Sequence, residues 1–153
     1  MAVSCPAFAE LAEALCRAAG TSLPPLTPDT AGGFGFRLEI DGVTVSVTHY
    51  PAHFPEHAFV LVGFGPVPAS AEADVFRELL NANLVMLRPG APAFARDPLD
   101  GQIVLQASCA LAETSGDALL AGIRVAVGKA IEWRRAHRLS PDQGDRLLGT
   151  DFA

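Results

Sequence analysis

Two runs of alternating apolar and polar residues, joined by Asp41-Gly42, constrain the fold of this chain more than any other feature. In residues 34–40, phenylalanine, leucine and isoleucine alternate with glycine, arginine and glutamate, and in residues 43–48 valine alternates with threonine and serine. A period of two places successive side chains on opposite faces of a strand. Asp-Gly is a strong signal for a two-residue hairpin turn. The segment therefore predicts an antiparallel β-hairpin.

The following segment extends this hairpin into a three-stranded meander. Residues 57–65 form a continuous apolar run, which favours a strand that is covered on both faces. Residues 50–56 contain Pro51 and Pro55, so they connect two strands rather than continue either of them. Three successive strands joined by short connections predict an antiparallel sheet.

Three stretches of the chain have apolar residues at helical spacing. The first predicted helix covers residues 5–19, and the third covers residues 115–137. The second begins after Ser70, which we expect to be its N-cap, and ends at the break formed by Pro89-Gly90.

Two short strands are predicted between the second and third helices. Residues 93–97 and 103–107 flank a turn at residues 97–101, which is rich in aspartate, proline and glycine. The order is helix, three strands, helix, two strands, helix, which predicts an α+β fold with an antiparallel twisted sheet packed by three helices. We expect residues 5–137 to form one domain and residues 138–153 to form a polar, flexible tail.

The composition indicates a protein that binds another protein. Half of the 153 residues are hydrophobic, only 18% are charged, and the mean hydropathy is +0.29. Apolar residues in excess of what a small core can bury are often covered by a partner. The net charge of −6 repels phosphate groups, so we expect neither nucleic acid nor a membrane surface as a partner.

The cysteines and the N-terminal sequence predict a cytoplasmic protein, and the near replacement of lysine by arginine, with Lys129 the only lysine, indicates a bacterial source. The chain has three cysteines, Cys5, Cys16 and Cys109, and no C-x-x-C pair. An odd number of cysteines favours free thiols in a reducing compartment, where they act as small buried apolar side chains. The first residues lack the basic region and apolar core of a signal peptide, and no apolar run is long enough to span a bilayer.

The sequence carries no recognisable catalytic pattern. It contains no G-x-S-x-G, no H-E-x-x-H and no phosphate-binding glycine loop, so we expect neither an enzyme nor a cofactor. His49, His53 and His57 have the spacing that would stack metal ligands on a helix, but Pro51 and Pro55 forbid that helix, and we expect no metal. The alternative function left open is a small-ligand or metal-binding regulatory protein that uses this histidine loop.

The second predicted helix resembles a known family. Residues 76–84, FRELLNANL, resemble the "LL-x-x-N-L" signature of the class I type III secretion chaperones, the family that includes the chaperone of the Tir effector. The resemblance continues through residues 94–97, 101–105 and 132–134. Residues 50–56, with two prolines and a histidine, depart from the family pattern.

The resemblance implies a homodimer that keeps the N-terminal segment of a secreted effector protein soluble and extended for export, with the secretion ATPase as a further partner. An extended peptide can add a strand to a sheet edge while its alternate side chains fill apolar pockets. The effector-binding pockets would be formed by the first helix and the first strands, through Phe8, Leu11, Leu15, Phe34, Phe36, Leu38, Val45 and Val47. The two-fold dimer interface would be formed by the second helix and the last strand, through Phe76, Leu79, Leu80, Asn83, Leu84, Ile103 and Leu105.

Overall fold

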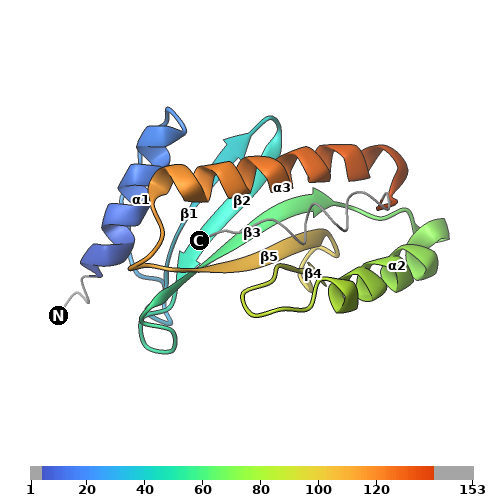
Figure 1. Cartoon of the computed structure of the whole chain (residues 1–153), viewed down its shortest axis with the longest axis horizontal. Coiled ribbons are helices and arrows are strands. Elements are labelled where there is room, and N and C mark those ends of the chain that lie inside the picture. The colour runs from blue at the N-terminus through green and yellow to red at the C-terminus, as the bar shows by residue number, and fades with distance from the viewer. Residues whose placement is uncertain (1–4, 140–153) are drawn as a thin grey trace.

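The elements of the chain follow the order that the hydrophobic periodicity predicts. In the computed structural model, residues 5–139 are described. The elements are α1 (Pro6–Ala18), β1 (Phe34–Ile40), β2 (Val43–His49), β3 (His57–Gly65), the 3₁₀ turn η1 (Ala69–Ala71), α2 (Glu72–Val85), β4 (Ala93–Arg96), β5 (Ile103–Ala110) and α3 (Gly116–Ala136) (Figure 1). The predicted α+β class, with an antiparallel sheet and three helices, is confirmed. Apart from residues 138 and 139, the predicted tail at 138–153 lies outside the described residues.

The predicted hairpin opens the sheet. β1 and β2 are antiparallel, and Ile40 lies opposite Val43 on either side of the two-residue turn. Asp41 and Gly42 both have positive φ, 51° and 78°. This conformation matches the twist of the flanking strands, and aspartate followed by glycine adopts it at little cost.

The five strands form one antiparallel sheet in the order β1-β2-β3-β5-β4. β3 lies at the centre, because β5 returns beside it after the excursion through α2 and β4. β1 and β4 are the two edge strands, so each has one side without a neighbouring strand in the sheet. Unpaired backbone groups along such an edge can bind an additional strand.

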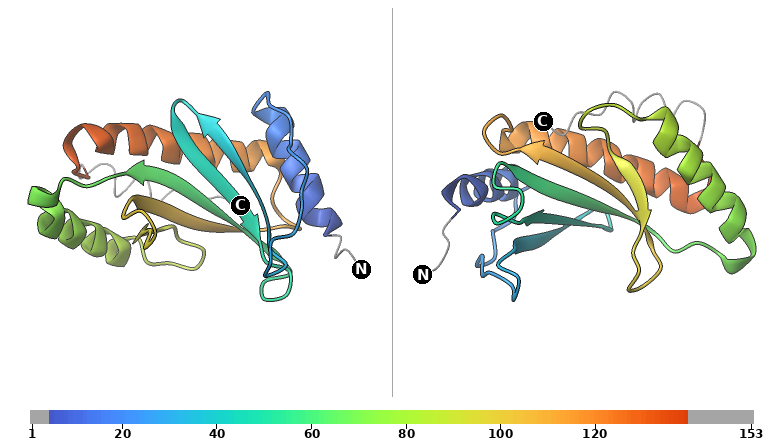
Figure 2. Two further views of the ribbon diagram at one scale, coloured as in Figure 1. Left: turned by 180° about the vertical axis from the view of Figure 1, so that it is seen from behind. Right: turned by 90° about the horizontal axis from the view of Figure 1, so that it is seen from below.

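Among residues 5–139, helices cover one face of the sheet. Alternate residues of β1, β2, β3 and β5 are buried beneath α1 and α3, which lie over that face (Figures 1 and 2). On the opposite, outer face, Phe59 and Leu61 of β3 are only half-buried. The prediction that residues 57–65 would be covered on both faces is therefore wrong for the described part of the protomer.

Helices α1 and α3 approach each other closely where Gly116 begins α3. A Cβ atom added to Gly116 would lie 2.6 Å from the carbonyl carbon of Ala14, so only glycine fits against the α1 backbone. Ser115 caps α3 by accepting a hydrogen bond from the Ala118 N–H at 3.1 Å. Within residues 5–139, no helix is both long enough and apolar enough to cross a membrane.

The start of α2 differs from the prediction. Ser70 lies inside the turn η1, and the N-cap of α2 is Ala71, which makes no side-chain capping bond. Pro68 is extended, and its carbonyl accepts a turn hydrogen bond from the Ala71 N–H at 2.9 Å. The chain therefore makes one tighter turn first, which moves the helix start past Ser70 to Glu72.

Arg134 fastens the C-terminal end of α3 to the sheet. Its Nε donates to the Phe64 carbonyl at 2.7 Å, Nη2 to the Gly63 carbonyl at 2.9 Å, and Nη1 to the Gly42 carbonyl at 3.2 Å. A β-bulge in β3 at this point breaks the regular pairing with β5. The guanidinium thus satisfies carbonyl groups around the bulge and the hairpin turn.

Candidate interaction surfaces

Helix α2 presents a continuous apolar surface to solvent. Leu80 and Leu84 are 68% and 73% exposed and lie one turn apart on α2, and Leu87, 76% exposed, follows just beyond the end of the helix, with Val85 exposed beside them. We call these four residues the α2 stripe. Single exposed leucines are common, but a contiguous apolar surface marks an interaction site.

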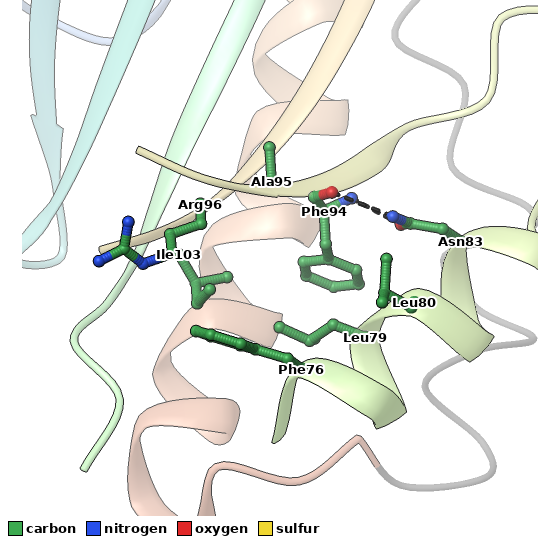
Figure 3. A pocket seen from close by; sticks show the side chains of 8 residues that line it. All are labelled: Phe76, Leu79, Leu80, Asn83, Phe94, Ala95, Arg96 and Ile103. Carbon is green, nitrogen blue, oxygen red and sulfur yellow. Dashed lines mark hydrogen bonds between the residues drawn. The ribbon is translucent and has the colours of Figure 1, made fainter. Parts of the chain in front are cut away.

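A groove of about 210 Å³ borders the α2 stripe on the side of the sheet. Its lining comes from three elements and is mostly apolar (Figure 3). The lining residues are Phe76, Leu79, Leu80 and Asn83 of α2, Phe94, Ala95 and Arg96 of β4, and Ile103 of β5. Leu80 belongs to both surfaces, so the groove and the stripe form one continuous apolar region.

Asn83 holds the edge strand β4 beside α2. Its Oδ1 accepts a hydrogen bond from the Phe94 N–H at 2.7 Å, and its Nδ2 donates to the Phe94 carbonyl at 3.0 Å (Figure 3). The side-chain amide thus bonds both backbone groups of one strand residue, as a neighbouring strand would. Asn83 is therefore engaged within the protomer.

The seven residues expected at a dimer interface fall into different environments. Leu80 and Leu84 are exposed and Phe76 is half-buried, whereas Leu79 and Ile103 are buried at the groove. Leu105 is fully buried. The expectation for Leu105 needs correction, because the strand period turns its side chain toward the core and leaves Val104 and Gln106 on the outer face. The sequence analysis missed Leu87 and Val85, although Leu87 continues the spacing of Leu80 and Leu84.

The eight residues expected to line effector-binding pockets all belong to the core. The α1 members of the set are buried against the inner faces of β1 and β2, and none of the eight is more than 8% exposed. They are Phe8, Leu11, Leu15, Phe34, Phe36, Leu38, Val45 and Val47. In the protomer they lie in the core and not in open pockets, and their contact with an effector stays a prediction.

The outer face of the sheet carries an aromatic cluster that the sequence analysis did not identify as a site. Phe54, half exposed, packs edge-on against Phe59 with ring centres 5.1 Å apart, and Tyr50 lies 6.4 Å from the same ring. Tyr50 and Phe54 come from the segment 50–56, which departs from the family pattern. The available signal was the aromatic side chain directly before each of Pro51 and Pro55.

The three histidines do not form a metal site. His49 is completely buried on the inner face of the sheet. His57, the first residue of β3, is exposed. His53 is exposed in the connecting turn. Among residues 5–139, no group of three or more histidine, cysteine, aspartate or glutamate side chains is placed to hold a metal ion. The histidine-loop alternative finds no support.

Comparison with known proteins places the chain in one family. The model of the Tir chaperone protein (CesT) family matches residues 10–134. A chain in the structure of the HopA1–SchA chaperone–effector complex is similar with a TM-score of 0.53 at 17% identity, over 90% of this chain and 98% of that chain.

A chain in the crystal structure of the ExsC–ExsE complex is similar with a TM-score of 0.54 at 18% identity, over 85% of this chain and 92% of that chain. These two likenesses show a shared fold. No curated protein matches the sequence.

Proposed function

The chain belongs to the Tir chaperone protein (CesT) family, and from this membership we propose that it is a type III secretion chaperone that binds the N-terminal segment of an effector protein. The observation that carries the proposal is the extent of the family match, which runs from α1 into the last turn of α3. One of the similar solved structures is itself a chaperone–effector complex. The effector segment would be held extended and soluble until export.

The proposed chaperone is a homodimer that forms through the α2 stripe and the adjoining groove. Both are apolar, exposed and contiguous, and a two-fold contact requires one patch that complements itself. Pairing of two α2 helices across a two-fold axis would bury Leu80, Leu84 and Leu87 of each protomer. This removes the exposed leucines of the α2 stripe from solvent.

The proposed effector-binding site is the free edge of β1. The turn at Asp41-Gly42 makes Ile40 and Val43 a hydrogen-bonded pair, and such pairs alternate along an antiparallel ladder. Gly35, Arg37 and Glu39 therefore direct their N–H and C=O groups away from β2. Among residues 5–139, no strand pairs with this edge, so an extended effector segment can add to it as a sixth strand.

Binding alone accounts for this function. We propose that the protein is not an enzyme and acts in the bacterial cytoplasm, where the effector is made. The secretion ATPase is the proposed second partner, because an effector held by a chaperone must be handed to the export machinery.

The experiment compares Arg37→Pro with Arg37→Ala in binding to N-terminal segments of proteins secreted by the source bacterium. Proline removes an edge N–H that takes no part in the β1–β2 ladder, whereas alanine keeps it and removes only the charged side chain. We expect Arg37→Pro to weaken effector binding about five- to tenfold, because a lost backbone hydrogen bond costs about 1–1.5 kcal/mol.

Calorimetry measures both dissociation constants, and circular dichroism verifies that both variants fold. If no secreted N-terminal segment binds the wild-type protein, the chaperone proposal fails. If a segment binds and both variants retain its full affinity, the function stands but the site is not the β1 edge.

A further inference from the structure

Cys5 and His49 form a thiol–imidazole pair that the proposed chaperone function does not use. Cys5 directly precedes α1, and His49 is the last residue of β2. The Cys5 Sγ lies 3.0 Å from His49 Nε2, although the two residues are 44 positions apart in sequence. The fold thus brings a nucleophile and a base into hydrogen-bond contact.

The surroundings of His49 fix which ring nitrogen is the base. Nδ1 lies 2.8 Å from the His57 carbonyl oxygen, which can only accept a hydrogen bond, so the Nδ1 proton is donated there. Nε2 of the neutral ring is then the acceptor for the Cys5 S–H. The ring also stacks on Phe8, with centres 5.1 Å apart and an interplanar angle of 24°. Nucleophile, base and orienting group therefore have the arrangement that activates nucleophiles in proteins.

The other two cysteines provide an internal contrast. Cys5 is partly exposed, whereas Cys16 and Cys109 are buried. Burial raises the pKa of the Cys16 thiol. Burial also raises the pKa of the Cys109 thiol, against the opposing effect of hydrogen bonds with Thr114 and with the Ala58 backbone. Because the thiolate is the reactive form, Cys16 and Cys109 are both shielded and chemically disfavoured.

We propose that Cys5 is a thiol-modification site that reacts with small disulfides such as oxidised glutathione, with His49 as the base. The S–H proton moves to Nε2 while the Cys5 sulfur attacks one sulfur of the reagent. The reagent's S–S bond breaks, its second sulfur leaves with the electron pair, and that thiolate takes the proton from the imidazolium. Cys5 is oxidised to a mixed disulfide and the reagent is reduced to one free thiol, so no further oxidant is required.

Modification would alter the contact between α1 and the sheet. The mixed disulfide has no S–H, so Nε2 of the fully buried His49 loses its hydrogen-bond donor. An unsatisfied buried polar atom is costly. The first turn of α1, which includes Phe8 stacked on His49, would therefore loosen.

The test measures the modification rate of each cysteine in the full-length protein with oxidised glutathione at pH 7, by acid quenching and peptide mass mapping. The folded protein is compared with the same protein in urea, where no pair can form. We expect folding to accelerate Cys5 at least about tenfold, as general-base assistance allows, and to suppress Cys16 and Cys109. A Cys5 that reacts no faster in the folded protein than in urea would overturn the proposal.

A variant distinguishes activation of Cys5 by His49 from reactivity that comes only from exposure of the thiol. His49→Gln keeps a polar side chain but removes the basic nitrogen, so Cys5 should react about tenfold more slowly in the folded variant. Circular dichroism confirms folding before the rates are compared. A folded His49→Gln protein whose Cys5 reacts as fast as in the wild type would exclude His49 as the base. If the variant does not fold, the comparison of folded and urea-treated wild type decides alone.

Discussion

At the scale of single residues, the side-chain amide of Asn83 holds the edge strand β4 in place. β4 has only four residues and pairs on one side with β5. On its other side, Asn83 takes the place of a neighbouring strand at Phe94. Because Phe94 and Ala95 line the groove beside the α2 stripe, the geometry of this surface depends on one side chain.

Asn83→Ala tests this dependence. Alanine leaves both backbone groups of Phe94 without their side-chain partners, which should cost about 1–3 kcal/mol in the free energy of unfolding. The Phe94 amide should also exchange its hydrogen faster. Urea denaturation and hydrogen-exchange mass spectrometry measure the two effects. Asn81→Ala, at an exposed position on the same helix, is the matched control and should change neither quantity. Equal stability of the two variants would contradict the role given to Asn83.

Single residues also show where sequence reasoning reaches its limit. The motif around Asn83 was recognised, but its role as an anchor for β4 depends on a partner eleven positions away, which no local pattern specifies. His49 was grouped with His53 and His57 by spacing alone. The strand places His49 beneath α1 against Phe8 and Cys5. Distance along the chain carried no information about this contact, because the two residues are 44 positions apart and a helix, a long loop, β1 and most of β2 lie between them.

At the scale of elements, the α1–α3 crossing is set by small residues. Gly116 lets the start of α3 contact the α1 backbone at Ala14. Gly128, in the same helix, has no heavy atom within 4 Å of a hypothetical Cβ. Gly116 and Gly128 thus differ in surroundings, and of these two only Gly116 is required by packing.

Substitution of each glycine by alanine should therefore have opposite effects. Gly116→Ala forces α1 and α3 apart and should destabilise the protein by about 1–3 kcal/mol, the range for overpacked contacts. Gly128→Ala should leave stability unchanged or raise it by up to about 1 kcal/mol, since alanine favours helix. Urea-induced unfolding of both variants measures the difference. If the two substitutions shift the midpoint equally, the proposed close contact at Gly116 does not control the packing.

Hydrophobic periodicity predicts where the helices and strands lie, but it does not predict which of their faces other elements cover. A period of two located β1 and β2, and helical spacing located all three helices. The same patterns could not show that α1 closes over Phe34 and Phe36, because a buried side chain and one in an open pocket have the same apolar signature. The coverage of β3 was wrong for a related reason. Its continuous apolar run predicts two covered faces, and the protomer covers one.

At the scale of the whole molecule, the sheet has a helical side and an open side. The helical side forms the core, while the β1 edge, the outer face and the α2 stripe remain available to partners. The free edge of β1 and the α2 stripe lie at opposite ends of the strand order, since α2 packs beside β4. Dimer formation through α2 would therefore leave both β1 edges free, so one dimer offers two equivalent binding edges.

The dimer is the property of the whole molecule that a single substitution tests most directly. Leu84→Asp places a carboxylate in the centre of the α2 stripe, and two-fold symmetry places it there twice. Burial of an unpaired charge is strongly unfavourable, so the dimer dissociation constant should rise at least about 100-fold, which corresponds to about 2.7 kcal/mol. Sedimentation equilibrium should give twice the 16.0 kDa chain mass for the wild type and the single chain mass for the variant.

Val125→Asp provides the matched control for that measurement. Val125 is also an exposed apolar helix residue, 45% exposed, but it lies on α3 and not on the α2 stripe. Both substitutions place one negative charge at an exposed apolar helix position, so the loss of a dimer only with Leu84→Asp identifies an interface at α2. A dimer that survives Leu84→Asp and dissociates with Val125→Asp would move the interface to α3, and a monomeric wild type would remove it. In either case the number of β1 edges in the assembly would have to be determined again. Two equivalent edges per dimer follow only if the protomers pair through α2.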